Sequence, residues 1–251
     1  PFDEPFKQLF NQGMVLKYSE KSGLVEKMSK SKGNVVSPDD MVKQYGSDVL
    51  RMYILFMGPP ELDCEWQDSG IEGVKRFANR MYDFLIKPGT ILPQGQTEDI
   101  QVTRRVHKLL QAYQERIDAF KPNTALSAFM EWINDATQQS MQLSRDSAEK
   151  VIVVLSTMAP FMATELLEQL FNKQLQNCSW PYANPEYTYD NTVEIIVQVN
   201  GKLRANVMVD RGAEQATVEQ LARAAITHWL ADKNVMKIIF VKDRLINFVV
   251  K

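Results

Sequence analysis

The feature that most constrains the fold is a helical spacing of apolar residues that runs through residues 70–171. Apolar side chains recur there at positions i, i+3, i+4 and i+7, which places them on one face of an α-helix. Lys87-Pro88-Gly89 and Lys121-Pro122-Asn123 interrupt the pattern, because Pro and Gly end helices. The four apolar stripes lie at 71–85, 102–120, 125–141 and 151–171. Four helices joined by short connections predict an antiparallel bundle, with a kink at Pro160 in the last helix.

The spacing of apolar residues changes from 3.6 to 2 after residue 191, which is typical of strands. The segments with this alternation are 192–200, 203–209, 235–241 and 245–250. The first two are predicted to form a hairpin, with either Gly201-Lys202 or Asn200-Gly201 as its turn.

A helix is predicted within this region at 217–231, where Thr217 can cap the first turn and Gln220 follows three residues later. Residues 172–191 are rich in Asn, Gln, Pro and Tyr, and this composition predicts a linker. Residues 192–251 are therefore expected to form a separate α+β domain.

Two short helices are predicted before the bundle. Ser37 can cap the first, and Pro38 occupies a position where a missing N–H costs nothing. Gly46-Ser47-Asp48 begins the second, and Gly58-Pro59-Pro60 ends it. Residues 17–26 are polar and contain a Gly, so a short hairpin or loop is expected there.

The composition excludes several classes of protein. The chain has 251 residues, 45% of them hydrophobic and 24% charged, with a net charge of −2, as in ordinary globular proteins. Its longest aliphatic run, 151–155, is far shorter than the roughly 18 residues of a membrane helix, and no secretory pattern opens the chain. We therefore expect a cytoplasmic protein without membrane contact. Cys64 and Cys178 lack metal-site spacing and are expected to be structural thiols.

The charge is unevenly distributed along the chain. Residues 192–251 contain nine Lys and Arg against six Asp and Glu, a balance of +3, so the remainder carries −5. A basic surface of this size fits contact with a polyanion, and it equally fits the solvated face of a small domain.

The chemistry of the chain is concentrated in Lys27-Met28-Ser29-Lys30-Ser31. Two ammonium groups three residues apart can reach ATP phosphates, and the small residues with Gly33 let the backbone approach them closely. Lysines placed beside a departing pyrophosphate stabilise the transition state more than the ground state. On charge alone, a solvated lysine-rich loop is the favoured interpretation of the segment, and the exact string of residues reverses that preference.

This string, KMSKS, resembles the second ATP-binding motif of the class I aminoacyl-tRNA synthetases. The resemblance covers nearly the whole chain and is closest to the leucyl-tRNA synthetase family. The segments that carry it are Gln12-Gly13-Met14-Val15, Tyr45-Gly46-Ser47-Asp48 with Arg51, Pro59-Pro60-Glu61, 65–70 with Gly73 and Arg76-Phe77, Asn123-Thr124-Ala125 with Glu131 and Asn134, Met158-Ala159-Pro160, Trp180-Pro181 and Val199-Asn200-Gly201-Lys202.

The resemblance implies a mainly α chain with a small α+β domain at its C-terminal end. The implied parts are the end of a Rossmann catalytic domain with the KMSKS loop (1–34), a stem-contact region (35–69), a four-helix anticodon-binding bundle (70–185) and a C-terminal tRNA-binding α+β domain (192–251).

The same resemblance implies the ligands and their residues. ATP is expected to bind Lys27, Met28, Ser29, Lys30 and Ser31, with Lys27 and Lys30 catalytic, and Mg²⁺ is expected on the nucleotide rather than at a protein metal site. The tRNA(Leu) is expected to contact Arg76, Arg80, Lys202 and Arg204. A paired-Arg helix face can hold phosphates bidentately, although it also suits helix solubility.

One motif of the family is missing. The HIGH sequence does not occur, and His107 and His228 lack its neighbours, so both are expected to be ordinary helix residues. The chain opens at Pro1 without Met, and its first apolar residues look like part of a core that began earlier. We therefore expect a C-terminal part of a synthetase that is inactive alone and reaches leucine and ATP through a missing N-terminal half, in a monomeric full-length enzyme or a split heterodimer. The alternative is a free-standing tRNA-binding module derived from a synthetase.

Overall fold

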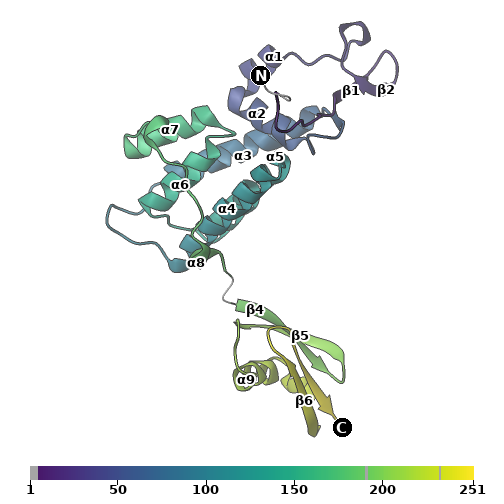
Figure 1. Ribbon diagram of the computed structural model, residues 1–251, viewed down its shortest axis with the longest axis vertical. Coiled ribbons are helices and arrows are strands. Elements are labelled where there is room, and N and C mark those ends of the chain that lie inside the picture. The colour runs from purple at the N-terminus through teal and green to yellow at the C-terminus, as the bar shows by residue number, and fades with distance from the viewer. Residues whose placement is uncertain (1–4, 190–191, 232) are drawn as a thin grey trace. The chain divides into compact units, whose positions relative to one another are not determined.

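The computed structural model describes residues 5–189, 192–231 and 233–251 (Figure 1). The described residues up to Thr188 form one compact unit, and those from Tyr189 onward form a second. The chain is mainly helical, with two small mixed sheets, one in each unit. The coarse fold class expected from the sequence is therefore confirmed.

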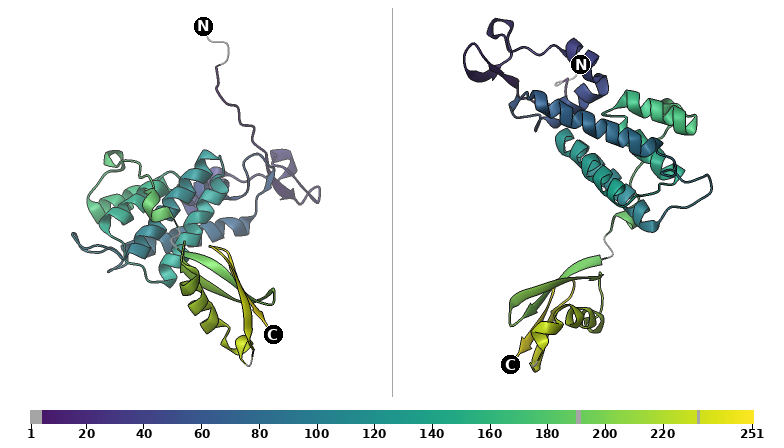
Figure 2. Two further views of the ribbon diagram at one scale, coloured as in Figure 1. Left: turned by 60° about the horizontal axis from the view of Figure 1, so that its bottom comes forward. Right: turned by 180° about the vertical axis from the view of Figure 1, so that it is seen from behind.

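The body of the first unit is built from the helices that the apolar stripes predicted. They are α3 (Asp68–Ile86), α4 (Ile100–Asp118), α5 (Pro122–Gln138), α6 (Arg145–Leu155) and α7 (Pro160–Phe171). In the described part of the chain α4 packs against α5 and α6, and α3 packs against α5 and α7 (Figure 2). The stripe residues of α3 are buried in one hydrophobic cluster together with residues from the other four helices.

The expected kink at Pro160 is wrong. The chain leaves the helix after Leu155 and starts a new one with Pro160 in its first turn. Proline has no N–H to donate, and its ring clashes with the carbonyl four residues earlier, so a helix start suits it better than a helix interior. Among the described residues, the four predicted stripes thus become five helices.

The break between α6 and α7 is held by α2 (Ser47–Phe56), the second of the two predicted N-terminal helices. The Asp48 carboxylate accepts hydrogen bonds from the backbone N–H groups of Phe161 (3.3 Å) and Met162 (2.7 Å) in the first turn of α7. Arg51 Nη2 donates to the carbonyl oxygen of Thr157 (3.3 Å). The Gly-Ser-Asp helix start and Arg51 therefore fasten the N-terminal helices to the bundle.

The segment predicted to be a linker is packed against the bundle up to Thr188. It contains a 3₁₀ turn (Leu175–Asn177) and the short helix α8 (Pro185–Thr188). Trp180 Nε1 donates to Gln114 Oε1 (2.8 Å), and the Asn184 N–H donates to His107 Nδ1 (2.9 Å). The linker prediction is therefore wrong up to Thr188, because aromatic and polar side chains anchor the segment, and residues 190–191 lie outside the described part.

A three-stranded sheet precedes the bundle. The strands β1 (Val15–Ser19) and β2 (Leu24–Lys27) form an antiparallel hairpin, and β3 (Cys64–Glu65) pairs with β1 in parallel. Gly23, at φ 71°, lies in the turn and allows the left-handed conformation. The helix α1 (Pro38–Tyr45) follows, and Ser37 caps it by accepting from the Asp40 N–H (3.4 Å), as the sequence predicted.

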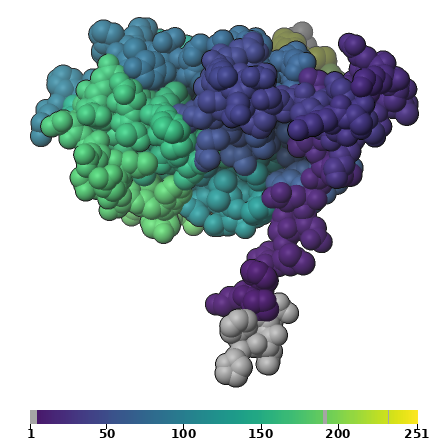
Figure 3. Space-filling view, turned by 90° about the horizontal axis from the view of Figure 1, so that it is seen from above, coloured from purple at the N-terminus to yellow at the C-terminus, as the bar shows by residue number. Residues whose placement is uncertain are grey.

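The first described residues, from Pro5 onward, run as an extended segment that leaves the body of this unit, purple in Figure 3. Phe6 and Leu9 are exposed, whereas the ring of Phe10 contacts Phe120 with centroids 4.1 Å apart. The chain joins the unit where the Gly13 N–H donates to the carbonyl oxygen of Pro60 (2.9 Å).

The second unit is an α+β domain, as predicted. Its elements are β4 (Thr192–Val199), β5 (Lys202–Asp210), α9 (Gln215–Ala225), α10 (Thr227–Leu230), β6 (Val235–Val241) and β7 (Leu245–Val250), with strand order β5-β4-β7-β6. Val218, Ala222 and Ile226 share a buried cluster with inward residues of the sheet, such as Val197 and Phe248.

The structure settles the turn of the second hairpin and corrects the helix start. Asn200 (φ 48°) and Gly201 (φ 76°) both occupy the left-handed region between β4 and β5, so Asn200-Gly201 is the turn. The helix α9 begins at Gln215 after Glu214, with no side-chain cap, and Thr217 lies inside its first turn. The predicted cap is wrong because the chain enters the helix two residues earlier than the Thr-x-x-Gln pattern indicated.

Candidate functional site

The KMSKS segment lies where the first hairpin passes into a short helical turn. Lys27 is the last residue of β2, and Lys30–Lys32 form a 3₁₀ turn. Gly33 ends this turn at φ 70°, and its N–H donates to the carbonyl oxygens of Ser29 (3.1 Å) and Lys30 (3.2 Å). Because a residue with a Cβ rarely adopts this backbone conformation, Gly33 fixes the shape of the loop.

The structure divides the lysines of this loop into two groups. Lys27 and Lys30 are exposed, and the ammonium group of neither takes part in an ion pair or hydrogen bond within the described part of the chain. Lys32 is ion-paired with Glu26, and Lys21 Nζ donates to the carbonyl oxygen of Ser31 (2.9 Å). The hydrogen bond from Lys32 holds the pKa of Glu26 below its ordinary value. Two cations thus hold the loop, and the two lysines singled out from the sequence remain available to a ligand.

Met28 lies between the two available lysines and points the other way. It is half-buried and packs against the main hydrophobic cluster of the first unit. On either side of Lys30, the hydroxyl oxygens of Ser29 and Ser31 are 2.9 Å apart and share a hydrogen bond. The loop is therefore anchored to the hydrophobic cluster through Met28, while Lys27 and Lys30 face outward.

Two buried polar side chains form hydrogen bonds with the backbone of the loop. The sequence patterns did not single out either of them. Ser19 is 1% exposed, and its hydroxyl donates to the carbonyl oxygen of Lys32 (2.9 Å). Asn34 is 3% exposed and hydrogen-bonds to three backbone groups of the loop and hairpin. Ser and Asn are usually exposed, and where they are buried they have hydrogen-bond partners. In the sequence, only the position of these two residues near the motif could have pointed to them.

The arginines expected to contact tRNA lie on α3. Arg76 and Arg80 are both exposed, one helical turn apart, and neither forms an ion pair in the described part of the chain. The neighbouring Lys75 places its ammonium 5.2 Å from the centroid of the Tyr45 ring.

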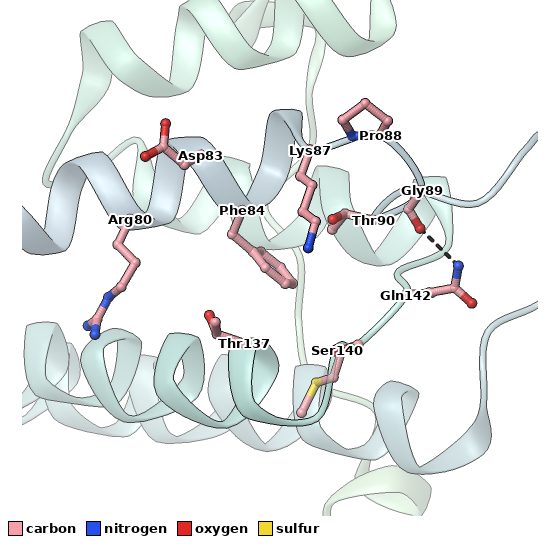
Figure 4. Close-up of a pocket in the computed structure, with 11 residues that line it drawn as sticks. Arg80, Asp83, Phe84, Lys87, Pro88, Gly89, Thr90, Thr137, Ser140 and Gln142 are labelled. Atoms are coloured by element: carbon pink, nitrogen blue, oxygen red, sulfur yellow. Dashed lines mark hydrogen bonds between the residues drawn. The ribbon is translucent and has the colours of Figure 1, made fainter.

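Arg80 also lines a cavity of about 520 Å³ between the C-terminal ends of α3 and α5. Figure 4 shows Arg80 and Lys87 reaching into the same space, with Thr137 and Ser140 on the opposite wall. The carbonyl ends of two helices face this region, and cations are favourable there whether or not a ligand binds.

Lys202 and Arg204 lie on β5 in the second unit, but a β-bulge separates them. Ala205 pairs with Val197 and Leu203 pairs with Gln198, so Arg204 is an extra residue without a partner across the ladder. In a regular strand residues two apart lie on the same face, but this alternation does not hold across the bulge. Lys202 is exposed, whereas the guanidinium of Arg204 stacks over the Trp229 ring, 3.6 Å from its centroid.

Two further observations concern ligands and membranes. Across the ranges that the structure describes, no three His, Cys, Asp or Glu side chains gather where they could hold a metal ion, and Cys64 and Cys178 are free thiols. No helix in those ranges combines the length and the apolar content needed to cross a bilayer.

Comparison with known proteins gives two family matches, one to the N-terminal segment of the chain and one to the helical bundle and the residues after it. A family model described as tRNA synthetases class I (I, L, M and V) matches residues 2–67, and a model of the anticodon-binding domain of tRNA ligase matches residues 99–220. A segment similar to class I tRNA synthetases is thus followed by a segment similar to their anticodon-binding domain.

The similar proteins narrow this class. The leucine–tRNA ligase of Fervidobacterium nodosum is 40% identical over 267 residues, which cover 100% of this chain and 32% of the relative. That of Thermotoga maritima is 39% identical over 270 residues, covering 99% and 32%. A solved LeuRS of Agrobacterium radiobacter K84, in a ternary complex with tRNA and LeuAMS, superposes with a TM-score of 0.71 at 25% identity, covering 100% of this chain and 33% of that one. Over its whole length the chain is therefore similar to leucine–tRNA ligases, and it spans about a third of the length of these relatives, corresponding to their C-terminal part.

Proposed function

We propose that the chain supplies the KMSKS loop and the tRNA-binding regions of a leucine–tRNA ligase, which uses ATP to join leucine to tRNA(Leu). The observation that carries the proposal is the state of Lys27 and Lys30, exposed and without partners in the described residues, on a loop that Met28 and buried polar side chains anchor. Without the half that contains HIGH and the leucine pocket, the chain is inactive.

The chemistry of the loop follows from the reaction. The leucine carboxylate attacks the α-phosphorus of ATP, the bond to the bridging oxygen breaks, and pyrophosphate leaves with growing negative charge. Lys27 and Lys30 donate to the departing phosphates, and Mg²⁺ arrives with the nucleotide. One preorganised donor of this kind lowers the barrier by roughly 3 kcal/mol. The hydroxyls of Ser29 and Ser31 add neutral donors beside the two ammonium groups.

The tRNA is held by cations outside the loop. Arg76 and Arg80 contact backbone phosphates from α3, and Lys202 and Arg204 do so from β5. Phosphate contacts position a nucleic acid without reading its sequence. In this proposal residues 1–34 end the catalytic domain, 35–69 contact the acceptor stem, 70–185 bind the anticodon arm and 192–251 contact the tRNA elsewhere.

The test is reconstitution with the missing half. We expect neither this chain nor the HIGH-containing half to catalyse leucine-dependent ATP–pyrophosphate exchange alone, and we expect the mixture to exchange and to leucylate tRNA(Leu). In the mixture the double variant Lys27→Ala/Lys30→Ala should abolish exchange. The matched control is Lys43→Ala, which removes an exposed lysine of α1 outside the loop.

Two results would contradict the proposal. Exchange by this chain in isolation would show that the site is complete without the other half. Binding of tRNA without activity in any mixture would favour the free-standing tRNA-binding module. Measuring the molecular mass of the mixture distinguishes a monomeric enzyme from a split heterodimer. We also propose that the protein is located in the cytoplasm.

A further inference from the structure

Asn34 is a buried amide in a loop whose other polar residues are mostly exposed. It directly follows Gly33, and only 3% of its surface is accessible. A buried amide is costly unless its oxygen and both N–H groups find partners, so its hydrogen bonds decide whether it is tolerated.

All of these groups have partners. Asn34 Oδ1 accepts from the Ser29 N–H (2.8 Å), and Nδ2 donates to the carbonyl oxygens of Lys17 (2.9 Å) and Glu26 (3.2 Å). The partners fix the orientation of the amide, because one is a donor and the other two are acceptors. One side chain thus joins β1, β2 and the KMSKS turn.

The three partners bracket the available lysines. Glu26 directly precedes Lys27, and Ser29 directly precedes Lys30. The Asn34 amide therefore fixes the backbone next to each lysine at once. The bond from Ser19 to Lys32 acts further along the turn and touches neither neighbour.

We infer that Asn34 is a positioning residue that sets where the ammonium groups of Lys27 and Lys30 lie relative to the leaving pyrophosphate. The inference rests on the proposed function of the loop. Without the amide, the Ser29 N–H and two carbonyl groups lose their partners, and the turn can shift against the hairpin. A displacement of about 1 Å at a reacting group can cost on the order of 100-fold in rate.

A purely structural role for Asn34 predicts something different. It would lower the stability of the hairpin, and activity would fall only as far as the folded fraction falls. A positioning role lowers kcat for pyrophosphate exchange in protein that remains folded, while the KM for leucine and the affinity for tRNA stay the same.

The experiment uses the full-length enzyme that contains this chain, with Asn34→Ala and Asn34→Asp. The aspartate keeps the shape and the acceptor for Ser29, but it turns an oxygen toward the two carbonyl groups. The control is Ser147→Ala, which removes a buried hydroxyl of α6 that bonds to Glu98, far from the loop in sequence. Lys30→Ala reports on the proposed function itself.

We expect both Asn34 variants to lower kcat for exchange about 100-fold, with the KM for leucine and the Kd for tRNA unchanged. Ser147→Ala should alter thermal stability only. If Lys30→Ala is impaired and the folded Asn34 variants exchange at the wild-type rate, the positioning role is overturned and the proposed function stands. If Lys30→Ala itself exchanges normally, the proposed function of the loop fails, and the inference fails with it.

Discussion

The hairpins β1–β2 and β4–β5, with the turn that follows the first, each carry two basic residues that we propose contact a polyanion, but the two pairs are held differently. In the first hairpin Lys27 and Lys30 stand free on a turn that hydrogen bonds and Met28 immobilise. In the second, Lys202 follows a tight Asn-Gly turn and Arg204 sits on a bulge, stacked on Trp229. Stabilising a leaving group needs fixed geometry, whereas contacts to a tRNA backbone only need charge in the right region.

The same difference separates the two units. All the polar side chains that are buried within the described residues lie in the first unit, namely Ser19, Asn34, Thr90, His107 and Ser147. The buried cluster of the second unit is apolar in those residues. Satisfied polar networks fix one arrangement of a structure, since an alternative arrangement leaves a buried group unpaired. The unit that carries the KMSKS loop is therefore the one whose arrangement is fixed more specifically by buried hydrogen bonds.

The largest effect is expected at the first hairpin. In the full-length enzyme, Lys30→Ala removes one donor to the leaving pyrophosphate and should lower kcat for exchange by roughly 100-fold or more, with a smaller effect on leucine binding. Steady-state exchange kinetics measure both. An unchanged kcat with only a raised KM for leucine would show that Lys30 does not act on the leaving group. The two hairpins would then not differ in the step they affect.

A smaller effect is expected at the second hairpin, and on a different step. The double variant Lys202→Ala/Arg204→Ala should weaken tRNA binding and reduce the slope of log K against log salt by roughly 1–2, because about two phosphate contacts are lost. Pyrophosphate exchange should stay near the wild-type rate. Filter binding over a salt series, beside exchange assays, gives both values. An unaltered slope would mean that this basic surface is only solvated.

The stack of Arg204 on Trp229 should contribute a modest amount to the stability of the second unit. A double-mutant cycle with Arg204→Ala and Trp229→Leu is expected to show a coupling energy of about 0.5–1 kcal/mol, the range for a cation over an aromatic ring near the surface. Urea unfolding of the four proteins measures it. Additive single variants would show that Arg204 is as unconstrained as Lys27 and Lys30.

The smallest expected effect is a pH dependence of stability that is present in the first unit and absent from the second. Burial, with repulsion from Lys150, holds the pKa of His107 below its ordinary value of 6.5, and Nδ1 must stay unprotonated to accept from the Asn184 N–H. The unfolded chain therefore binds a proton more readily, so the first unit should lose stability as the pH falls through 6.5.

Hydrogen exchange read separately for each unit at pH 7.5 and 5.5 tests this expectation. The loss should be confined to the first unit, and it should be smaller in His107→Asn, whose amide oxygen can accept the same bond without titrating. Equal losses in both units, or in the variant, would show that His107 does not distinguish them.

Local patterns in the sequence predicted most of the elements. The spacing of apolar residues located the helices of the bundle, Ser37-Pro38 located the start of α1, and alternation located the strands of the second unit. These succeeded because helix and strand periods depend on neighbours within about four residues. The KMSKS string likewise located the loop that carries the two available lysines.

The wrong predictions, at Pro160 and in the segment expected to be a linker, have the same cause: the deciding contacts are distant in sequence. Pro160 was compatible with a kink or a new helix, and the contacts of Asp48 across 113 residues are formed only with the helix start. The composition of residues 172–191 predicted a linker, but Trp180 and Asn184 form hydrogen bonds with side chains of α4. A pattern read locally does not contain the partner that decides between two conformations.

The sequence by itself determined that two lysines of KMSKS stand three residues apart in a flexible-looking loop, and that a bundle and an α+β domain follow it. Only the tertiary structure decided which lysines are free, because Lys21 and Lys32 are taken by Ser31 and Glu26. It also decided what holds the loop, since Asn34 reaches back 17 residues to Lys17. Hydrogen bonds between residues far apart in sequence form only when the fold brings them within about 3 Å, and no local spacing encodes that distance.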